Sequence, residues 1–177
     1  MKKVIFVISL IVASVTLASA QRLAYVDSEY ILKHIPEYTA AQKQLDDLST
    51  KWQTEVDNQY EEIEKLYQAY QNDQVLLNED MRRRREDEIV NKEKQVKDFQ
   101  RQKFGFEGDL YKERIRLVQP IQDRVSNAIQ EIAKSDSLDL ILDKGSEVAI
   151  LFANPSLDKS NDIITKLGLK PNPSLAN

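Results

Sequence analysis

Apolar side chains recur every three or four positions through the middle of the chain, from about Glu37 to Ser135. This spacing aligns them along one side of an α-helix, and the resulting stripe is narrow, as in a coiled coil. We therefore predict an uninterrupted helical tract that folds into a long antiparallel helical hairpin. The stripe of its first helix contains Leu45, Leu48, Trp52, Val56, Tyr60, Ile63, Tyr67 and Tyr70.

A turn near residues 77–80 is predicted to separate the two helices. Asn78 is a suitable N-cap, and Glu79 and Asp80 lie where the helix dipole favours acidic side chains. Few apolar residues follow between Met81 and Asp98, so this stretch is expected to fray or bend.

Three helix-breaking residues occur further along the second helix. Gly105 and Gly108 each lower helix stability, and we predict that they form a hinge. Pro120 is expected either to kink the helix or to make it restart.

The segments on either side of the helical tract are predicted to contain short strands. Arg22–Asp27 and Leu138–Asp143 are mostly apolar, and Glu147–Phe152 is predicted to form a hairpin with the second of them. A further short helix is expected over Ser160–Leu167. The tail, residues 169–177, contains two prolines and is predicted to be flexible.

A short helix is also predicted directly after the first strand. Ser28 is expected to cap its N-terminus, and the helix should stop at Ile35, since proline disfavours helix at the residue before it. Pro36 then suits the first turn of the long helix.

The first twenty residues have the pattern of a secretory signal peptide. Lys2 and Lys3 precede an apolar run, and Ala18-Ser19-Ala20 supplies small residues for cleavage after Ala20. A retained anchor is the less favoured alternative, because the run is shorter than the roughly 20 residues of a spanning helix. We predict export to the periplasm.

Composition excludes several classes of function. The chain has no Cys, so it has neither disulfides nor thiolate metal sites. Removing the two signal lysines leaves 23 basic residues against 29 acidic ones, a net charge of −6. Nucleic-acid-binding proteins usually carry the opposite sign.

Residues that could carry catalysis are sparse. His34 is the only histidine, so a histidine-containing triad or a histidine-rich metal site would have to depend on it alone. Asp27, Asp139 and Asp143 are interpreted as turn and strand-end residues. Phosphate-binding glycine motifs are absent from the sequence. We therefore predict no catalytic site, no metal site and no cofactor.

Two groups of side chains on the hairpin are candidates for binding. Arg82, Arg83, Arg84 and Arg85 form a basic block that is either a solvated helix face or a contact for lipid headgroups and acidic client segments. The narrow stripe cannot bury every ring, so some are predicted to contact unfolded chains. The candidate client-binding residues are Trp52, Tyr60, Tyr67, Tyr70, Met81, Phe99, Phe104 and Phe106.

The ordered set of these segments resembles the Skp/OmpH family of periplasmic chaperones over essentially the whole mature chain. The resemblance is carried by Leu23-Ala24-Tyr25-Val26-Asp27, by Pro36-Glu37, by the turn at 77–82, and by Pro120-Ile121-Gln122-Asp123-Arg124. It continues through Ala128-Ile129-Gln130-Glu131-Ile132-Ala133, Leu138–Asp143, Phe152-Ala153-Asn154-Pro155-Ser156 and Asp162-Ile163-Ile164. The chain departs from the basic members of this family in its acidic net charge.

The resemblance implies a mainly α fold with a small β body, from which the helical hairpin emerges as an arm. The body would comprise residues 21–36 and 118–168 and the arm residues 37–117. A lone copy of such a body is small for a stable core, so oligomerisation is expected. The resemblance implies a homotrimer joined through Leu23, Tyr25, Val26, Leu140, Leu142, Val148, Ile150 and Phe152.

The function implied by the resemblance is that of an ATP-independent holdase. Such a protein keeps unfolded outer-membrane proteins from aggregating in a cavity between the arms of a trimer. The alternative hypothesis is a structural periplasmic adaptor or spacer with one fixed protein partner. An enzyme is the least favoured class, because no nucleophile, base or metal cluster converges in the sequence.

Overall fold

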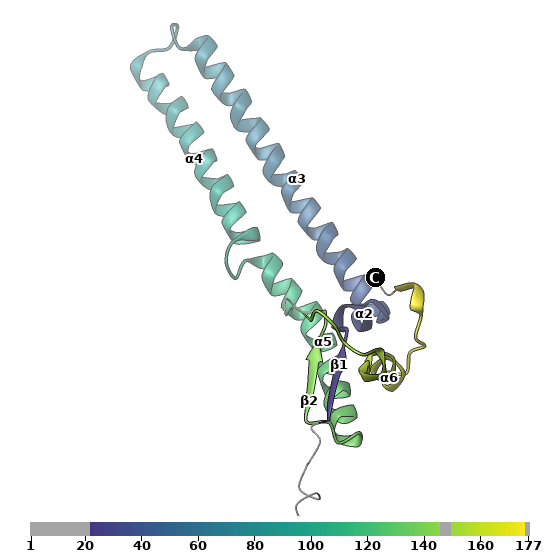
Figure 1. Ribbon diagram of the computed structural model, residues 1–177. Coiled ribbons are helices and arrows are strands. Elements are labelled where there is room, and N and C mark those ends of the chain that lie inside the picture. Colours follow the sequence, from purple (N-terminus) through teal and green to yellow (C-terminus); the bar gives the residue numbers. More distant parts are fainter. Residues whose placement is uncertain (1–21, 146–149, 176–177) are drawn as a thin grey trace, which may run out of the picture. The chain divides into compact units, whose positions relative to one another are not determined.

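The computed structural model describes residues 22–145 and 150–175, which form two compact units. The body unit comprises the described residues up to His34 and from Val125 onward, and the arm unit runs from Ile35 to Arg124. As predicted, the fold is mainly helical, with long paired helices and a small two-stranded sheet in the described part of the chain (Figure 1). None of the helices described is both long and apolar enough to cross a bilayer.

The arm unit is built from α3 (Pro36–Asp73), α4 (Glu79–Phe104) and the first part of α5 (Asp109–Ser135). Helices α3 and α4 run antiparallel, side by side (Figure 1). Pro36 occupies the first turn of α3 behind an extended Ile35, as predicted. The predicted cap of the second helix is also confirmed, because the Asn78 side chain accepts a hydrogen bond from the Met81 N–H at 2.9 Å.

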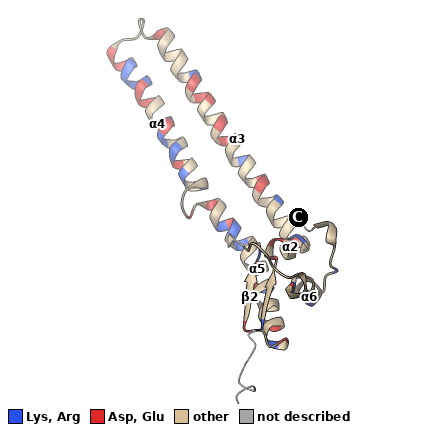
Figure 2. Cartoon of the chain, in the orientation of Figure 1, with Lys and Arg blue, Asp and Glu red and all other residues tan. Residues whose placement is uncertain are grey.

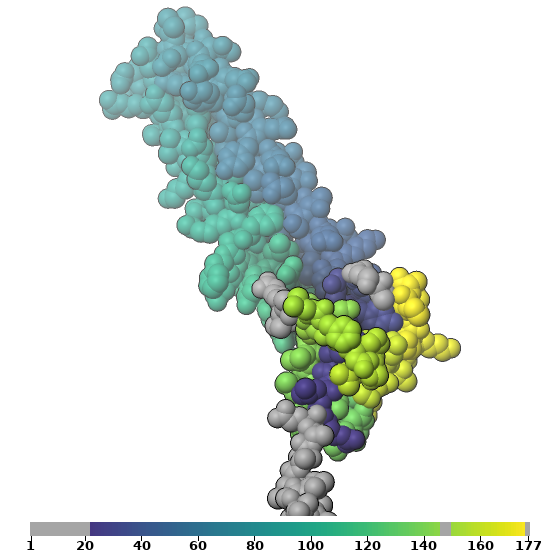
Figure 3. Space-filling view, in the orientation of Figure 1, coloured from purple at the N-terminus to yellow at the C-terminus, as the bar shows by residue number. Residues whose placement is uncertain are grey.

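A thin apolar seam joins α3 to α4. Val56 and Ile63 of α3 and Ile89 and Val96 of α4 are buried there. Side chains fill the space between the two helices (Figure 3). Leu66, Tyr70, Phe99 and Phe104 pack against the seam while remaining partly exposed.

Charge adds little to this pairing. Acidic side chains are frequent along α3, whereas α4 carries most of its basic residues near its ends (Figure 2). One ion pair crosses between the helices, Lys92 to Glu62 at 3.3 Å, and both side chains are largely exposed. Exposed pairs of this kind contribute at most about 1 kcal/mol, so burial in the seam dominates.

The helical tract is not uninterrupted, contrary to the prediction. Helix α4 ends at Phe104 and α5 begins at Asp109, with Gly105 as the C-cap of α4. Of the two alternatives predicted at Pro120, the restart is wrong, because α5 continues through this residue, and the kink stays a prediction. Proline removes one backbone hydrogen bond, and the buried Val118 and Ile121 on either side hold the helix in place.

The body unit contains a parallel pair of strands that are distant in sequence. Strand β1 (Leu23–Val26) pairs with β2 (Leu140–Asp143), and Tyr25 lies opposite Leu142. The predicted hairpin partner over 147–152 is not formed in its described part, since residues 150–152 are not a strand. Residues 146–149 lie outside the described residues. The other edge of β1 forms a bridge from Tyr25 to Asp158.

Helices α2 (Ser28–Lys33) and α6 (Ser160–Lys166) complete the apolar core of the body unit. Ile31, Ile163 and Ile164 are fully buried. The cap of α2 differs from the prediction, because Asp27 rather than Ser28 accepts the Tyr30 N–H, at 2.8 Å. The Ser28 hydroxyl instead donates to Asp143 at 2.6 Å, which ties α2 to the end of β2.

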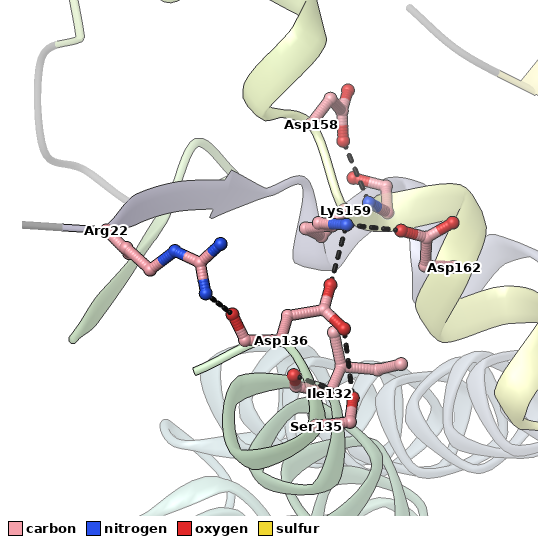
Figure 4. Close-up of polar contacts among 8 residues, drawn as sticks. Arg22, Ile132, Ser135, Asp136, Asp158, Lys159 and Asp162 are labelled. Atoms are coloured by element: carbon pink, nitrogen blue, oxygen red, sulfur yellow. Dashed lines mark hydrogen bonds and ion pairs between the residues drawn. The ribbon is translucent and has the colours of Figure 1, made fainter. Parts of the chain in front are cut away.

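Lys159 connects three segments of the body unit (Figure 4). Its ammonium lies 2.7 Å from Asp136, just beyond α5, and 2.9 Å from Asp162 in α6. The Lys159 N–H donates to the Tyr25 carbonyl at 2.9 Å. The hydrogen bond from Lys159 lowers the pKa of Asp136, and the same bond raises the pKa of Lys159.

The C-terminal segment, predicted to be a flexible tail, includes a 3-10 turn at Pro173–Leu175. The N–H of Asn172 donates to Nε2 of His34 at 2.8 Å. Since Nε2 accepts, the proton of the neutral ring lies on Nδ1, which is 2.8 Å from the Tyr30 carbonyl. The lone histidine therefore ties this segment to α2.

Candidate functional site

The rings predicted to bind clients divide into two groups along the arm unit. Trp52, Tyr70, Phe99 and Phe104 are half-buried; the last three pack against the seam, and the Trp52 ring contacts Phe104. The other four side chains are exposed: Tyr60 by 40%, Tyr67 by 47%, Met81 by 48% and Phe106 by 99%. The second group therefore offers free apolar surface, whereas the first group mainly holds the helices together.

Tyr60 and Tyr67 are seven residues apart, so they lie on one side of α3. Each flanks the buried seam position Ile63, at three and four residues' distance. At 40% and 47% exposure, both rings leave much of their surface open to solvent. An exposed tyrosine presents an apolar ring face and a hydroxyl to a binding partner.

Tyr70 is held by the opposite helix. Its hydroxyl donates to the Glu86 carboxylate of α4, and this hydrogen bond raises the pKa of the tyrosine. The Tyr70 ring also packs against the seam. Tyr70 therefore helps to join α3 to α4 and leaves less of its ring free for a client than Tyr60 or Tyr67 does.

Lys103 holds together the region where α4 ends. Its ammonium lies 4.9 Å from the centre of the Trp52 ring and 2.6 Å from a carboxylate oxygen of Asp109. The hydrogen bond from Lys103 lowers the pKa of Asp109. The Trp52 ring meets Phe104 edge-on at 6.2 Å. One cation thus links α3, α4 and the start of α5.

The two glycines predicted to form a hinge lie between α4 and α5. A Cβ at Gly105 would collide with the Arg101 carbonyl oxygen, and one at Gly108 would lie 2.9 Å from the carbonyl oxygens of Gln102 and Gly105. Both positions therefore exclude a side chain in this conformation. Their role as a hinge stays a prediction.

The turn between α3 and α4 exposes aliphatic residues that the sequence reasoning missed. Val75 is 88% exposed and Leu76 is 85% exposed. The available signal was that both lie outside the stripe of α3, two and three residues before the Asn78 cap. Together with Met81, they form an apolar tip of the arm unit.

The basic block begins in the first turn of α4, close to this tip (Figure 2). Arg82 donates to the Gln74 carbonyl at 3.1 Å, and so helps to close the turn. Arg83 and Arg85 form long, exposed pairs with Glu79 and Glu88, at 3.5 and 3.4 Å. Their guanidinium groups remain accessible to other anions.

The residues predicted to form the trimer interface differ in exposure. Tyr25 and Val26 are 8% and 2% exposed, so they are already covered within this chain. Burial, followed by the nearby Asp158 carboxylate, raises the pKa of Tyr25. Ile150 is half-buried and Val148 lies outside the described residues. The exposed members of the set are Leu23, Leu140, Leu142 and Phe152.

The three exposed leucines share one face of the sheet. Leu23 lies opposite Leu140, and Leu142 follows two residues later on the same side.

The Asp residues at the strand ends serve local structure: Asp139 accepts the Arg22 N–H at 2.8 Å, and Asp143 accepts the Ser28 N–H at 3.0 Å. Among residues 22–145 and 150–175, no group of His, Cys, Asp or Glu has the arrangement of a metal site.

The fold defines the chain as a helical-hairpin protein with a small strand-containing body. Residues 22–167 match the family model described as outer membrane protein (OmpH-like). The chain therefore belongs to the Skp/OmpH-like family of outer-membrane protein chaperones. The prediction that it is not an enzyme agrees with this membership.

Two relatives show how far the likeness extends. The chain is 25% identical to the chaperone protein Skp of Yersinia enterocolitica over 169 residues, which cover 94% of this chain and 99% of the relative. A crystal structure of a putative outer membrane chaperone (OmpH-like) from Caulobacter crescentus matches with a TM-score of 0.65 at 11% identity, covering 84% of this chain and 85% of that one. The second likeness supports the fold alone.

Proposed function

We propose that this protein is an ATP-independent holdase of the periplasm, which binds unfolded outer-membrane proteins and keeps them from aggregating. The observation that carries the proposal is the thin seam of the arm unit, which leaves rings such as Tyr60, Tyr67 and Phe106 open to solvent. Family membership supplies the class of client.

The mode of binding follows from this surface. Each exposed ring offers a small apolar contact, and no single contact is strong enough to hold a client. Several weak contacts on one molecule raise the effective concentration of each for its neighbours, so that the total retention is high while each contact exchanges quickly. This suits a chaperone that must release its client without nucleotide hydrolysis.

We also propose that three copies associate through their body units and enclose the client between their arms. The proposal is supported by Leu23, Leu140 and Leu142, which expose apolar surface on one face of the sheet. A two-stranded sheet is marginally stable by itself, and additional strands or apolar cover would stabilise it. Replacing Leu140 and Leu142 by Ser should reduce the mass in solution from that of three copies to that of one.

The decisive test is a light-scattering assay with a denatured β-barrel protein diluted into buffer. Stoichiometric amounts of the chaperone should suppress scattering without ATP. A triple variant of the exposed residues, Tyr60→Ser, Tyr67→Ser and Phe106→Ser, should lose most of this effect and keep its helical content. Unchanged suppression by this folded variant would remove the basis of the proposal.

The adaptor hypothesis makes a different prediction. A pull-down from envelope extract should recover many unrelated barrel proteins if the chain is a holdase, and one stoichiometric partner if it is an adaptor. The exposed rings favour the first outcome, because a fixed helical partner would require a continuous apolar groove.

We further propose that the arm tip contacts anionic membrane surfaces. Val75 and Leu76 are available to enter the headgroup region, and the basic block beginning at Arg82 is available to meet phosphate groups. Sedimentation with anionic vesicles should recover the protein at low salt, and the double substitution Val75→Ser and Leu76→Ser should weaken it. Equal recovery with zwitterionic vesicles would contradict the proposed role of the arginines.

A further inference from the structure

The break between α4 and α5 leaves an open hollow in the surface of the arm unit. Its volume is about 290 Å³. The lining includes three aromatic rings, a leucine side chain, a carboxylate and a guanidinium. The residues that line it are Phe104, Gly105, Phe106, Glu107, Leu110, Tyr111 and Arg114.

The backbone of the break directs Phe106 away from the seam. Gly105 and Gly108 have no room for a Cβ, and Glu107 between them has a positive φ of 53°. Phe106 is left 99% exposed beside the hollow. A ring of this size usually buries 150–250 Å² on folding, so packing within the arm unit does not explain its position.

Both walls of the hollow are held in place by contacts outside it. On the α4 side, Phe104 rests edge-on against the Trp52 ring at 6.2 Å. Across the break, Lys103 contacts Asp109 at 2.6 Å, immediately before Leu110. The hollow is therefore largely preformed, which reduces the entropy lost when a ligand enters.

We propose that this hollow is a receptor for one aromatic side chain of an extended client polypeptide. This inference rests on the proposed function and narrows it. The volume lies just below the 300–1,000 Å³ of pockets that enclose drug-sized ligands, so it suits a single side chain. The rings of Phe104, Phe106 and Tyr111 supply edge and face partners for another ring.

Arg114 adds a second reason to expect an aromatic occupant. Its guanidinium forms no hydrogen bond or ion pair with the described residues. A guanidinium beside an apolar hollow can stack on the face of an aromatic ring. Transmembrane β-barrels carry girdles of aromatic residues, so unfolded barrel chains present many such side chains.

The test uses two twelve-residue peptides of alternating polar and apolar residues that differ at one central position, Phe in one and Leu in the other. Binding is followed by the fluorescence of Trp52, the only tryptophan, which contacts Phe104. The Phe peptide should bind about two- to ten-fold more tightly, the range expected for one aromatic pair.

Substitutions then locate the preference. Phe106→Leu and Tyr111→Leu keep apolar surface but remove a ring, and each should bring the ratio of affinities towards one. Tyr38→Leu is the matched control, because Tyr38 is a half-buried ring of the same arm unit, lies outside the hollow and is not among the candidate client-binding residues. In that variant the ratio should be unchanged.

Three binding results would overturn the proposal that the hollow receives an aromatic side chain. They are equal affinity for both peptides, undetectable binding of both, and a preference for the Phe peptide that survives both hollow substitutions. A change in the mass of the protein on substitution, without a change in peptide preference, would assign the hollow to a second copy and likewise overturn it. Aggregation suppression by the wild-type protein separates the two levels. If the protein suppresses aggregation but does not prefer the Phe peptide, only the proposed role of the hollow is refuted. If it does not suppress aggregation, the proposed holdase function is refuted.

Discussion

The neighbouring residues Ile89 and Val90 provide a sharp test of the α3–α4 seam. Ile89 is 8% exposed and belongs to the buried cluster, whereas Val90 is 61% exposed on the same helix. Ile89→Ala and Val90→Ala therefore place the same new residue at adjacent positions, one inside the seam and one outside it.

The expected magnitudes differ clearly. Truncating a buried isoleucine to alanine usually costs about 2–5 kcal/mol, and a seam only two helices thick can partly collapse, so about 2–3 kcal/mol is expected here. Val90→Ala removes exposed surface and introduces a better helix former, so its effect should lie within about 0.5 kcal/mol of zero.

Amide hydrogen exchange is the suitable assay, because it reports on α3 and α4 separately from the body unit. A loss of 2–3 kcal/mol corresponds to roughly 30- to 150-fold faster exchange at the seam amides. Ile89→Ala should show this acceleration, and Val90→Ala should exchange nearly as the wild type does. Equal effects of the two substitutions, or a larger effect of Val90→Ala, would mean that the seam is placed on the wrong face of α4.

Single contacts give three further predictions. Gly105→Ala sets a Cβ against a backbone carbonyl, so the end of α4 must rearrange; an unchanged circular dichroism spectrum and thermal midpoint would contradict this. Because the hydrogen bond from Lys159 lowers the pKa of Asp136, the pair stabilises the body unit at pH values above the ordinary carboxyl range and loses this contribution as the pH falls through the lowered pKa. Asp136→Asn should therefore flatten the acid side of a stability profile from urea denaturation, and an identical slope would refute the assignment. His34→Ala removes the acceptor for the Asn172 N–H and should accelerate exchange of that amide without affecting α3; unchanged exchange there would show that the contact does not hold the segment.

Features set by neighbouring residues could be predicted from the sequence. Pro36 starts α3 and Asn78 caps α4, because each effect depends on the residue itself and the next turn. The apolar spacing likewise predicted the paired helices. Asp27 rather than Ser28 caps α2, since Asp143 from a distant strand takes the serine hydroxyl.

Features set by distant residues could not be predicted in the same way. The pairing of Leu23–Val26 with Leu140–Asp143 joins segments more than one hundred residues apart, whereas the sequence pattern favoured a local hairpin. Gly105 and Gly108 were recognised as residues that destabilise a helix. That α4 ends there depends on backbone carbonyl oxygens lying too close to both glycines for a Cβ, which is visible only in three dimensions.

The same distinction applies to the candidate site. The sequence identified the rings on the arm. Which of them are exposed depends on α4, because α4 contacts Tyr70 through Glu86, whereas Tyr67 is left 47% exposed. The phase of one helix against another is a three-dimensional property, so the free rings could not be separated from the packed ones by spacing alone.

Native mass spectrometry of the purified protein mixed with an unfolded β-barrel protein tests the central proposal most directly. The proposal predicts a complex of three copies of this chain with one client, formed without nucleotide. A spectrum containing only single chains, with the barrel protein unbound or aggregated, would contradict it.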